Sequence, residues 1–385
     1  MTTTGALILT AIDIADGKSP LIAPIEKHRL ERVKVATLAS TRSTPSLRIA
    51  VLAPIAWRTP PRHYGPWEQF ASLLTEGLVA LGHDVTLFAT GDSLTAGRLS
   101  SAVPHGWSED PLLEPKVAEC LHIAAVFEQA DQFDIIHNSF DFLPLTYCEL
   151  VATPVVTTIH GFSSEQIVAV YQRYNRTSAY VAISDANRHP KLDYAATIHH
   201  GINPNDFAVP DRADDYLLFF GRIHPDKGTA EAIEVARRVG RPLIIAGIIQ
   251  DDRYFNDAIE PHIDGHDVSF VGPVPVGDRA EMLGNAHALL HLINFDEPFG
   301  FSVVEAMACG TPVIAFDRGS MAEVVVDGVS GFVVHDIDQA VNAVGRVGEL
   351  DRAIVRDVTI ERFDAEHMVR QYADLYAHVV MARSH

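Results

Sequence analysis

The chain has 385 residues, of which 47% are hydrophobic, and its 30 Lys and Arg against 50 Asp and Glu give a formal net charge of −20. This length suits two domains with a large core, and the negative charge argues against nucleic-acid backbones and anionic lipid surfaces as partners. Three widely spaced cysteines, and no window near the roughly 20 apolar residues of a membrane span, favour a cytoplasmic protein without a transmembrane segment.

Residues 1–47 do not share the patterning of the rest of the chain. A short apolar patch at 6–12 is interrupted by Asp13, and residues 37–46 are rich in Ser and Thr. Because the apolar run is broken and no basic leader precedes it, the pattern is not that of a signal peptide. We predict a flexible N-terminal extension.

The first patterned segment predicts a strand, a helix and a second strand. Apolar runs at 48–54 and 82–88 flank a helical pattern that opens at Gly65-Pro66-Trp67-Glu68, an arrangement typical of a βαβ unit. The apolar residues of this helix are spaced as a stripe that faces a core, and they are Phe70, Leu73, Leu74, Leu78 and Leu81.

Apolar runs alternate with helical patterns through the remaining chain. They lie at 134–137, 154–159, 180–184, 216–220, 243–247, 268–272, 288–293, 313–316 and 331–334. This alternation predicts the α/β class, with two doubly wound Rossmann-like domains that face each other across a cleft. Pro204 and Pro210 interrupt the periodicity, so we expect an N-terminal domain at 48–205 and a C-terminal domain at 206–360.

Charged residues follow two apolar strands of the second domain. The run at 216–220 leads into Gly221-Arg222 and then Lys227-Gly228, and the run at 288–293 leads to Glu297. Loop cations of this kind are ordinarily solvated. Pro298 and Gly300 mark a loop that opens a helix near Ser302, where the backbone amides of Gly300, Phe301 and Ser302 have no helical partner. Such a helix start attracts phosphate oxygens.

Glu305, one turn inside this helix, has two interpretations. Ser302-Val-Val-Glu305 fits the S-x-x-E capping box, in which the carboxylate only accepts a hydrogen bond from the Ser302 amide. Alternatively, Glu305 and Glu297 form a pair of ligand-binding carboxylates around the loop. His160, which follows the apolar run at 154–159, also has two interpretations. A His that ends a strand is more often a structural hydrogen-bonding residue, but it can also face a ligand.

Taken together, these strings resemble the family 4 (group 1) retaining glycosyltransferases of GT-B architecture. The resemblance rests on Glu297 to Glu305 as an E-x7-E element, on Gly221-Arg222 to Lys227-Gly228 as G-R-x-x-x-x-K-G, and on the 196–207 stretch, where His200 replaces the usual Asn. It covers residues 48–376 and implies metal-independent transfer of a hexosyl group from a nucleotide-diphosphate sugar to an acceptor hydroxyl. UDP-sugar is our guess, GDP-sugar is possible, and the acceptor is unknown.

The resemblance also implies a role for each matched residue. Arg222 and Lys227 would clamp the diphosphate, Glu297 would hold the sugar, Glu305 would hold the ribose, and His160 would contact the sugar or the acceptor. The segment 361–385 would pack back on the N-terminal domain as a helix. Pro66 stands where the family usually has a second glycine. Further donor-binding positions are expected at Gly65, Gly221, Val274, Gly300, Phe301 and Ser302.

Two other functions share this architecture, a non-hydrolysing nucleotide-sugar 2-epimerase and a catalytically silent sugar-nucleotide-binding protein. The acid–base residues of the epimerase have no clear counterpart here, and the joint presence of Arg222, Lys227, Glu297 and Glu305 argues against a silent protein. We expect no metal cofactor, because Asp336-Ile-Asp338 follows a strand and is typical of a helix cap.

Overall fold

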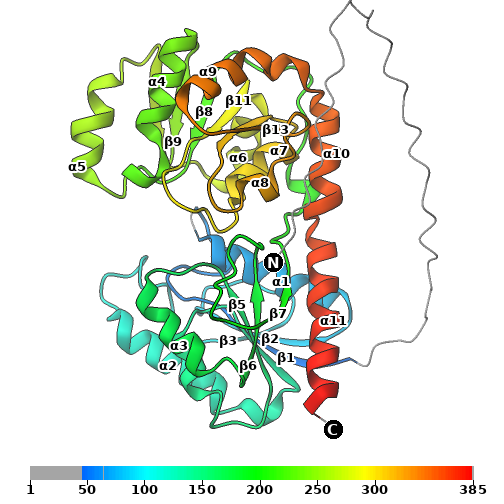
Figure 1. Cartoon of the computed structure of the whole chain (residues 1–385). Helices are drawn as coiled ribbons and strands as arrows, with labels where there is room; N and C mark the ends of the chain where they lie inside the picture. The colour runs from blue at the N-terminus through cyan, green and yellow to red at the C-terminus, as the bar shows by residue number, and fades with distance from the viewer. Residues whose placement is uncertain (1–45, 64, 384–385) are drawn as a thin grey trace, which may run out of the picture. The chain divides into compact units, whose positions relative to one another are not determined.

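The computed structural model describes residues 46–63 and 65–383, so the predicted extension at 1–47 lies almost wholly outside the described residues. These residues contain two sheets of parallel strands (Figure 1). The first has the order β3-β2-β1-β4-β5-β6-β7, with β1 (Arg48–Leu52), β2 (Asp84–Phe88), β3 (Arg98–Ser100), β4 (Ile135–Asn138), β5 (Val155–Ile159), β6 (Ser178–Ala182) and β7 (Tyr194–Thr197). The second has the order β10-β9-β8-β11-β12-β13, with β8 (Leu217–Phe220), β9 (Leu243–Ala246), β10 (Val268–Gly272), β11 (Ala288–His291), β12 (Val313–Phe316) and β13 (Gly331–Val334). The predicted α/β class with two doubly wound sheets is confirmed.

Helices cover both faces of the first sheet, and successive buried residues of β1 point to opposite faces. Ile49 and Val51 pack on one face in a core shared with α1 (Pro66–Ala80) and α11 (Ala365–Arg383). Ala50 and Leu52 point to the opposite face and pack in a core shared with α2 (Pro115–Phe127) and α3 (Val168–Arg173). Such strands are apolar throughout because neither face meets water.

The predicted apolar stripe on α1 is largely correct. Phe70, Leu74 and Leu78 are fully buried and Leu73 packs against the same core, whereas Leu81 is 37% exposed. Leu81 was wrongly included, because it is the C-cap of α1, after the last helical residue Ala80, and its side chain is exposed.

The second sheet is built in the same way. Leu218 faces the core formed with α7 (Phe301–Ala308), whereas Leu217 and Phe219 face the core formed with α4 (Thr229–Val239) and α9 (Ile337–Arg346). The remaining α-helices of the described chain are α5 (Asp252–Tyr254), α6 (Val276–Asn285), α8 (Met321–Val324) and α10 (Arg352–Phe363).

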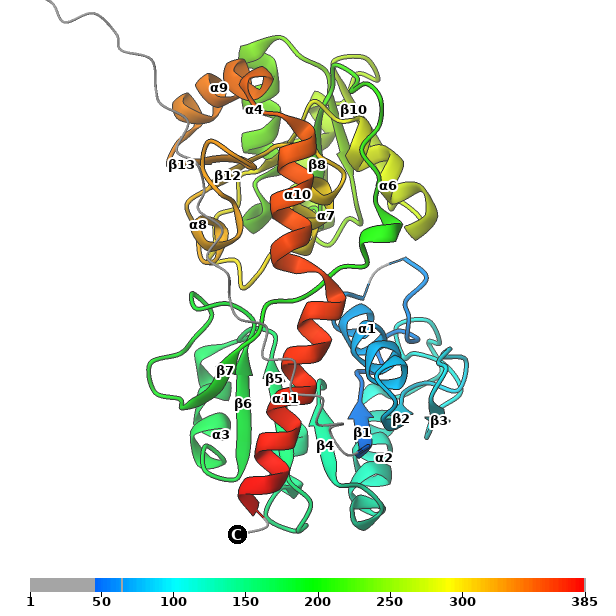
Figure 2. The ribbon, with the colours of Figure 1, turned by 90° about the vertical axis from the view of Figure 1, so that its right-hand side faces the viewer.

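The C-terminal segment does not form the single helix that the sequence predicted from residue 361. It breaks at Asp364 into α10 and α11, and Figure 2 shows α11 running across β4, β5 and β6. The break has a tertiary cause, because Ile202 N–H donates to Phe363 O at 2.8 Å and Ala365 N–H donates to Ile202 O at 2.9 Å. These two bonds form a β-bridge between Ile202 and Asp364, which requires extended backbone at Asp364.

Close packing of α11 on α1 leads to a stability prediction at Gly77. A Cβ added there would lie 2.4 Å from Val369 Cγ2, whereas a Cβ at Gly345 in α9 would meet nothing within 4 Å. We expect Gly77→Ala to lower the free energy of unfolding by about 1–3 kcal/mol through overpacking. The matched change Gly345→Ala should be neutral or stabilise by up to about 1 kcal/mol. Thermal melts compare the two, and equal melting temperatures would show that α11 does not pack on α1 in this way.

Candidate functional site

The loops that follow β8 and β11 lie side by side at one edge of the second sheet. β8 and β11 are neighbours in the sheet, with β9 and β10 on one side of this pair and β12 and β13 on the other. In doubly wound folds, ligands bind beyond the carboxyl ends of the two strands at which the strand order reverses in this way. Asn294 N–H donates to Asp226 O at 2.7 Å. Gly228 approaches the other loop so closely that a Cβ there would lie 1.8 Å from Leu292 O.

Lys227 and Glu297, which are 70 residues apart in sequence, form a buried ion pair at this edge. Lys227 Nζ donates to Glu297 Oε2 at 2.8 Å, and the two side chains are only 15% and 12% exposed. Burial by itself raises the pKa of Glu297, but the neighbouring His291 and Lys227 outweigh that effect and lower the pKa to about 2. The carboxylate is therefore charged at neutral pH and is paired with the Lys227 ammonium.

Arg222 and Gly221 contact residues at and after the end of β9. The Arg222 guanidinium donates to Gln250 in the loop after β9, so it lies at the neighbouring strand end. Gly221 N–H donates to Ala246 O at 3.0 Å, and its carbonyl lies against Gly247. Its amide is thus already used within the sheet.

The start of α7 presents unpaired backbone donors. Gly300 is its N-cap with φ +86° and makes no side-chain cap. Within the described part of the chain, the amides of Gly300, Phe301 and Ser302 have no hydrogen-bond acceptor. The capping-box interpretation of Glu305 is wrong, because Glu305 does not reach back to Ser302. This helix start keeps its capacity to bind an anion.

Glu305 instead pairs with Arg279 of α6. Arg279 Nη1 donates to Glu305 Oε1 at 3.0 Å, and Nη2 donates to His63 O at 2.9 Å. Burial raises the pKa of Glu305, and the guanidinium opposes that rise. The pair lines a small cavity of about 50 Å³ together with Asn203 and Phe301. Val274 has its side chain buried in the core of the second sheet, so a ligand would meet its backbone.

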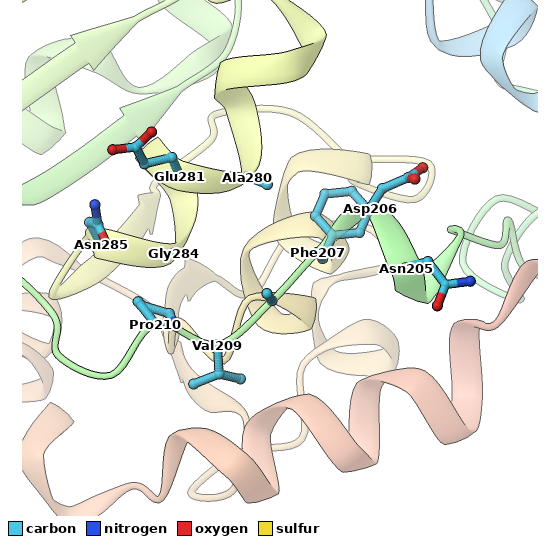
Figure 3. Close-up of a pocket in the computed structure, with 10 residues that line it drawn as sticks. Asn205, Asp206, Phe207, Val209, Pro210, Ala280, Glu281, Gly284 and Asn285 are labelled. Carbon is cyan, nitrogen blue, oxygen red and sulfur yellow. The ribbon is translucent and has the colours of Figure 1, made fainter.

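A second groove, of about 260 Å³, also borders Phe207, and Figure 3 shows the residues that line it. It is formed by residues 205–210 and α6, and it shares Asp206, Phe207 and Ala280 with the smaller cavity. None of the predicted site residues lines it.

His160 lies at the end of β5, next to the loop that carries Glu297. Ser184 Oγ donates to Pro298 O at 2.7 Å, and a Cβ on Gly161 would lie 3.2 Å from Pro298 Cγ. His160 is buried, with a relative exposure of 6%. Burial, with smaller effects of His200 and His137, lowers the pKa of His160 well below its usual value, so this ring is neutral.

At the start of α1, Gly65 has φ +148° and precedes Pro66 at the first helical position. Glu68 folds back under this turn, where its Oε1 accepts from Trp57 N–H at 3.3 Å. Burial raises the pKa of Glu68 to about 7. A Cβ at Gly65 would lie 2.8 Å from Glu68 Oε2, which explains the glycine independently of any ligand.

Two sequence matches identify the family. Residues 68–205 match the model described as "Glycosyltransferase Family 4", and residues 205–351 match "Glycosyl transferases group 1". The chain belongs to this family of glycosyltransferases.

Individual relatives support the same assignment. The phosphatidyl-myo-inositol mannosyltransferase of Mycobacterium tuberculosis is 24% identical over 383 residues, covering 86% of this chain and 96% of that protein. AviGT4, a glycosyltransferase of avilamycin A biosynthesis, superposes with a TM-score of 0.65 at 23% identity over 87% of this chain and 98% of its own. Anabaena HepE in complex with UDP and glucose gives 0.67 at 19% identity over 85% and 98%. These structures share the fold of this glycosyltransferase.

Two further sequence expectations concern membranes and metals. Over residues 46–63 and 65–383, the glycosyltransferase has no helix that is both long and apolar enough to cross a bilayer. Asp336 forms the predicted cap, since its carboxylate accepts from Gln339 N–H at 2.8 Å, and Asp338 pairs with Arg238. No cluster of potential metal ligands occurs within those same residues.

Three residues near the glycosyltransferase's candidate site were not predicted from sequence. His291 ends the otherwise apolar β11 with Nε2 3.5 Å from Glu297 Oε2, and a polar residue in a buried strand was the available signal. Arg279 pairs with Glu305 from a helix 26 residues upstream, and nothing in its local pattern indicates this. His200 was noted only as a replacement for Asn.

Proposed function

We propose that this glycosyltransferase retains configuration and moves a hexosyl group from a nucleotide-diphosphate sugar to an acceptor hydroxyl without a metal ion. A UDP-sugar is the first donor to test and a GDP-sugar the second. One observation carries the proposal, namely the buried Lys227–Glu297 pair on the loops after β8 and β11, where the strand order reverses. HepE, which shares the fold, has been crystallised with UDP-glucose.

The proposed reaction needs positive charge at the leaving diphosphate. The bond between the anomeric carbon and the phosphate oxygen breaks with its electron pair on the diphosphate, while the acceptor oxygen bonds the anomeric carbon. Lys227, Arg222 and the amides at the start of α7 would stabilise that developing charge; a preorganised donor of this kind contributes on the order of 3 kcal/mol. The acceptor proton would pass to a phosphate oxygen on the same face, so no protein nucleophile takes part.

The remaining residues would hold the donor. When the diphosphate occupies Lys227, Glu297 becomes free to accept hydrogen bonds from sugar hydroxyls. Glu305 would give up one hydrogen bond from Arg279 and accept hydrogen bonds from the ribose hydroxyls instead. The base would lie near the backbone of Val274. His160, from the other sheet, would contact the sugar or acceptor, so that both domains align the reactants.

A thermal-shift panel of UDP, GDP and ADP, each alone and as a sugar conjugate, tests donor binding. A nucleotide at 100 times its dissociation constant stabilises the folded state by about 2.7 kcal/mol, so the correct donor should raise the melting temperature clearly. No shift with any member would contradict the proposal.

Product analysis then distinguishes the chemistry. Retention at the anomeric carbon, with unchanged turnover in a chelator, is expected once an acceptor is found. Isomerisation of the donor in the absence of acceptor would favour the epimerase instead, and binding without turnover across many acceptors would favour a silent protein.

A further inference from the structure

His160 belongs to a buried cluster that contains His137 and His200. His160 Nδ1 lies 3.2 Å from His200 Nε2, and His160 Nε2 lies 2.9 Å from Ser139 Oγ. His137 bonds Tyr376 of α11 through Nδ1 at 2.8 Å. Both ring nitrogens of His160 thus have a polar partner, and one of these partners is His200, which follows β7.

Neighbouring aromatic rings fix the orientation of His160 and His200. Trp67, His160, His200 and Phe301 form a row of rings in which each ring is within 25° of parallel to the next. Successive centroids are 5.1, 5.1 and 4.7 Å apart, and the interplanar angles are 21°, 25° and 11°. Phe70 contacts both imidazoles, nearly edge-on to His160 and tilted to His200. His200 cannot rotate without disturbing Phe301 at the start of α7, and His160 cannot rotate without disturbing Trp67, Phe70 or His200.

Proton counting limits how the two imidazoles can share hydrogen. Burial lowers the pKa of His200 to about 3 and, with the neighbouring histidines, lowers that of His160 well below its usual value. Each ring therefore carries one N–H. Among the residues that the structure describes, His200 Nδ1 has no partner and is buried.

Two arrangements are consistent with these contacts. If His160 Nδ1–H donated to His200 Nε2, the proton of His200 would sit on Nδ1 as a buried donor without an acceptor. If His200 Nε2–H donates to His160 Nδ1, only a lone pair is left unpaired. Orphaned buried N–H groups are rarer than under-satisfied acceptors, so the second arrangement is favoured. His160 then carries its proton on Nε2 and donates to Ser139 Oγ.

We infer that His200 is a positioning residue, which holds His160 in the Nε2–H tautomer by donating its own Nε2–H to His160 Nδ1. The catalytic consequence rests on the proposed function: His160 would exchange its bond to Ser139 Oγ for one to the sugar or acceptor, and would meet that group as a hydrogen-bond donor of fixed orientation. An Asn at position 200 could also donate an N–H to Nδ1.

Nitrogen NMR of the full chain with ¹⁵N-labelled histidine tests the tautomer directly. Long-range ¹⁵N–¹H correlation shows which ring nitrogen carries the proton, and the signals lost in His160→Gln identify His160. We expect Nε2 protonated and Nδ1 unprotonated. A protonated Nδ1 would overturn the inference. This result needs neither donor nor turnover, so it stands or falls separately from the proposed function.

Two substitutions test the catalytic consequence. His200→Phe keeps a ring against Phe301 but removes the donor, and it should lower kcat about 10-fold, the loss of one buried hydrogen bond of about 1.4 kcal/mol, with little change in KM. His200→Asn loses the ring but keeps an N–H donor, and it should retain kcat within about threefold. Equal kcat values in the two variants would contradict the inference. If either variant fails to fold, the ¹⁵N–¹H spectrum of the wild-type protein alone decides whether His160 carries its proton on Nε2.

Discussion

Lys227→Ala is expected to lower turnover of the nucleotide sugar by roughly 100-fold or more. Among the described residues, Glu297 has two partners within ion-pair distance, Lys227 Nζ and His291 Nε2. In the proposed reaction the Lys227 ammonium faces the departing β-phosphate. With the ammonium gone, the leaving charge would depend on Arg222 and the α7 amides alone. Initial rates with the donor identified by thermal shift measure the effect.

The same substitution also removes the partner of a buried carboxylate. Breaking a buried ion pair costs about 3–5 kcal/mol, so lost turnover must be separated from unfolding. Lys227→Met combined with Glu297→Gln removes both charges and should regain stability without regaining turnover. Lys191→Ala, at an exposed ion pair with Glu165, controls for simple loss of a positive charge. Turnover near the native rate in Lys227→Ala would remove this residue from the site.

Gly228→Ala is expected to destabilise the protein by more than about 4 kcal/mol or to prevent folding. Gly228 has φ +74°, and an added Cβ would lie 1.8 Å from Leu292 O and 2.5 Å from Leu292 C. The backbone of the loop after β8 would therefore have to move away from the loop after β11. A single substitution that costs more than about 4 kcal/mol is uncommon and has a specific cause, such as overpacking or a strained backbone. Urea unfolding of the purified variant measures the change.

Gly240→Ala provides the matched control. Gly240 has nearly the same conformation, φ +67°, at the end of α4, but a Cβ there would meet nothing within 4 Å. We expect a loss of about 1–2 kcal/mol, the left-handed penalty alone. A comparable loss in the two variants would mean that the loops after β8 and β11 are not in contact.

The fold and the meeting of Lys227 with Glu297 could be predicted because both follow from strand order. Apolar runs mark the parallel strands, and the carboxyl ends of neighbouring strands meet at one edge of a sheet. The loops that carry these residues are therefore brought together although the residues are far apart in sequence.

Other parts of the site depend on contacts that no local pattern encodes. The four residues from Ser302 to Glu305 satisfy a capping box, but Glu305 is turned toward Arg279 of another helix. Likewise, the pattern at 361–376 is helical throughout, and the break at Asp364 appears only because Ile202 bonds the flanking backbone. In both cases a tertiary partner outcompetes the local preference.

A structure of the full chain with the nucleoside diphosphate that gives the largest thermal shift tests the central claim most directly. We predict β-phosphate oxygens within about 3 Å of Lys227 Nζ and of the backbone amides of Phe301 and Ser302. A diphosphate bound away from these atoms, for example beyond the ends of β1 and β4 in the first sheet, would contradict the account.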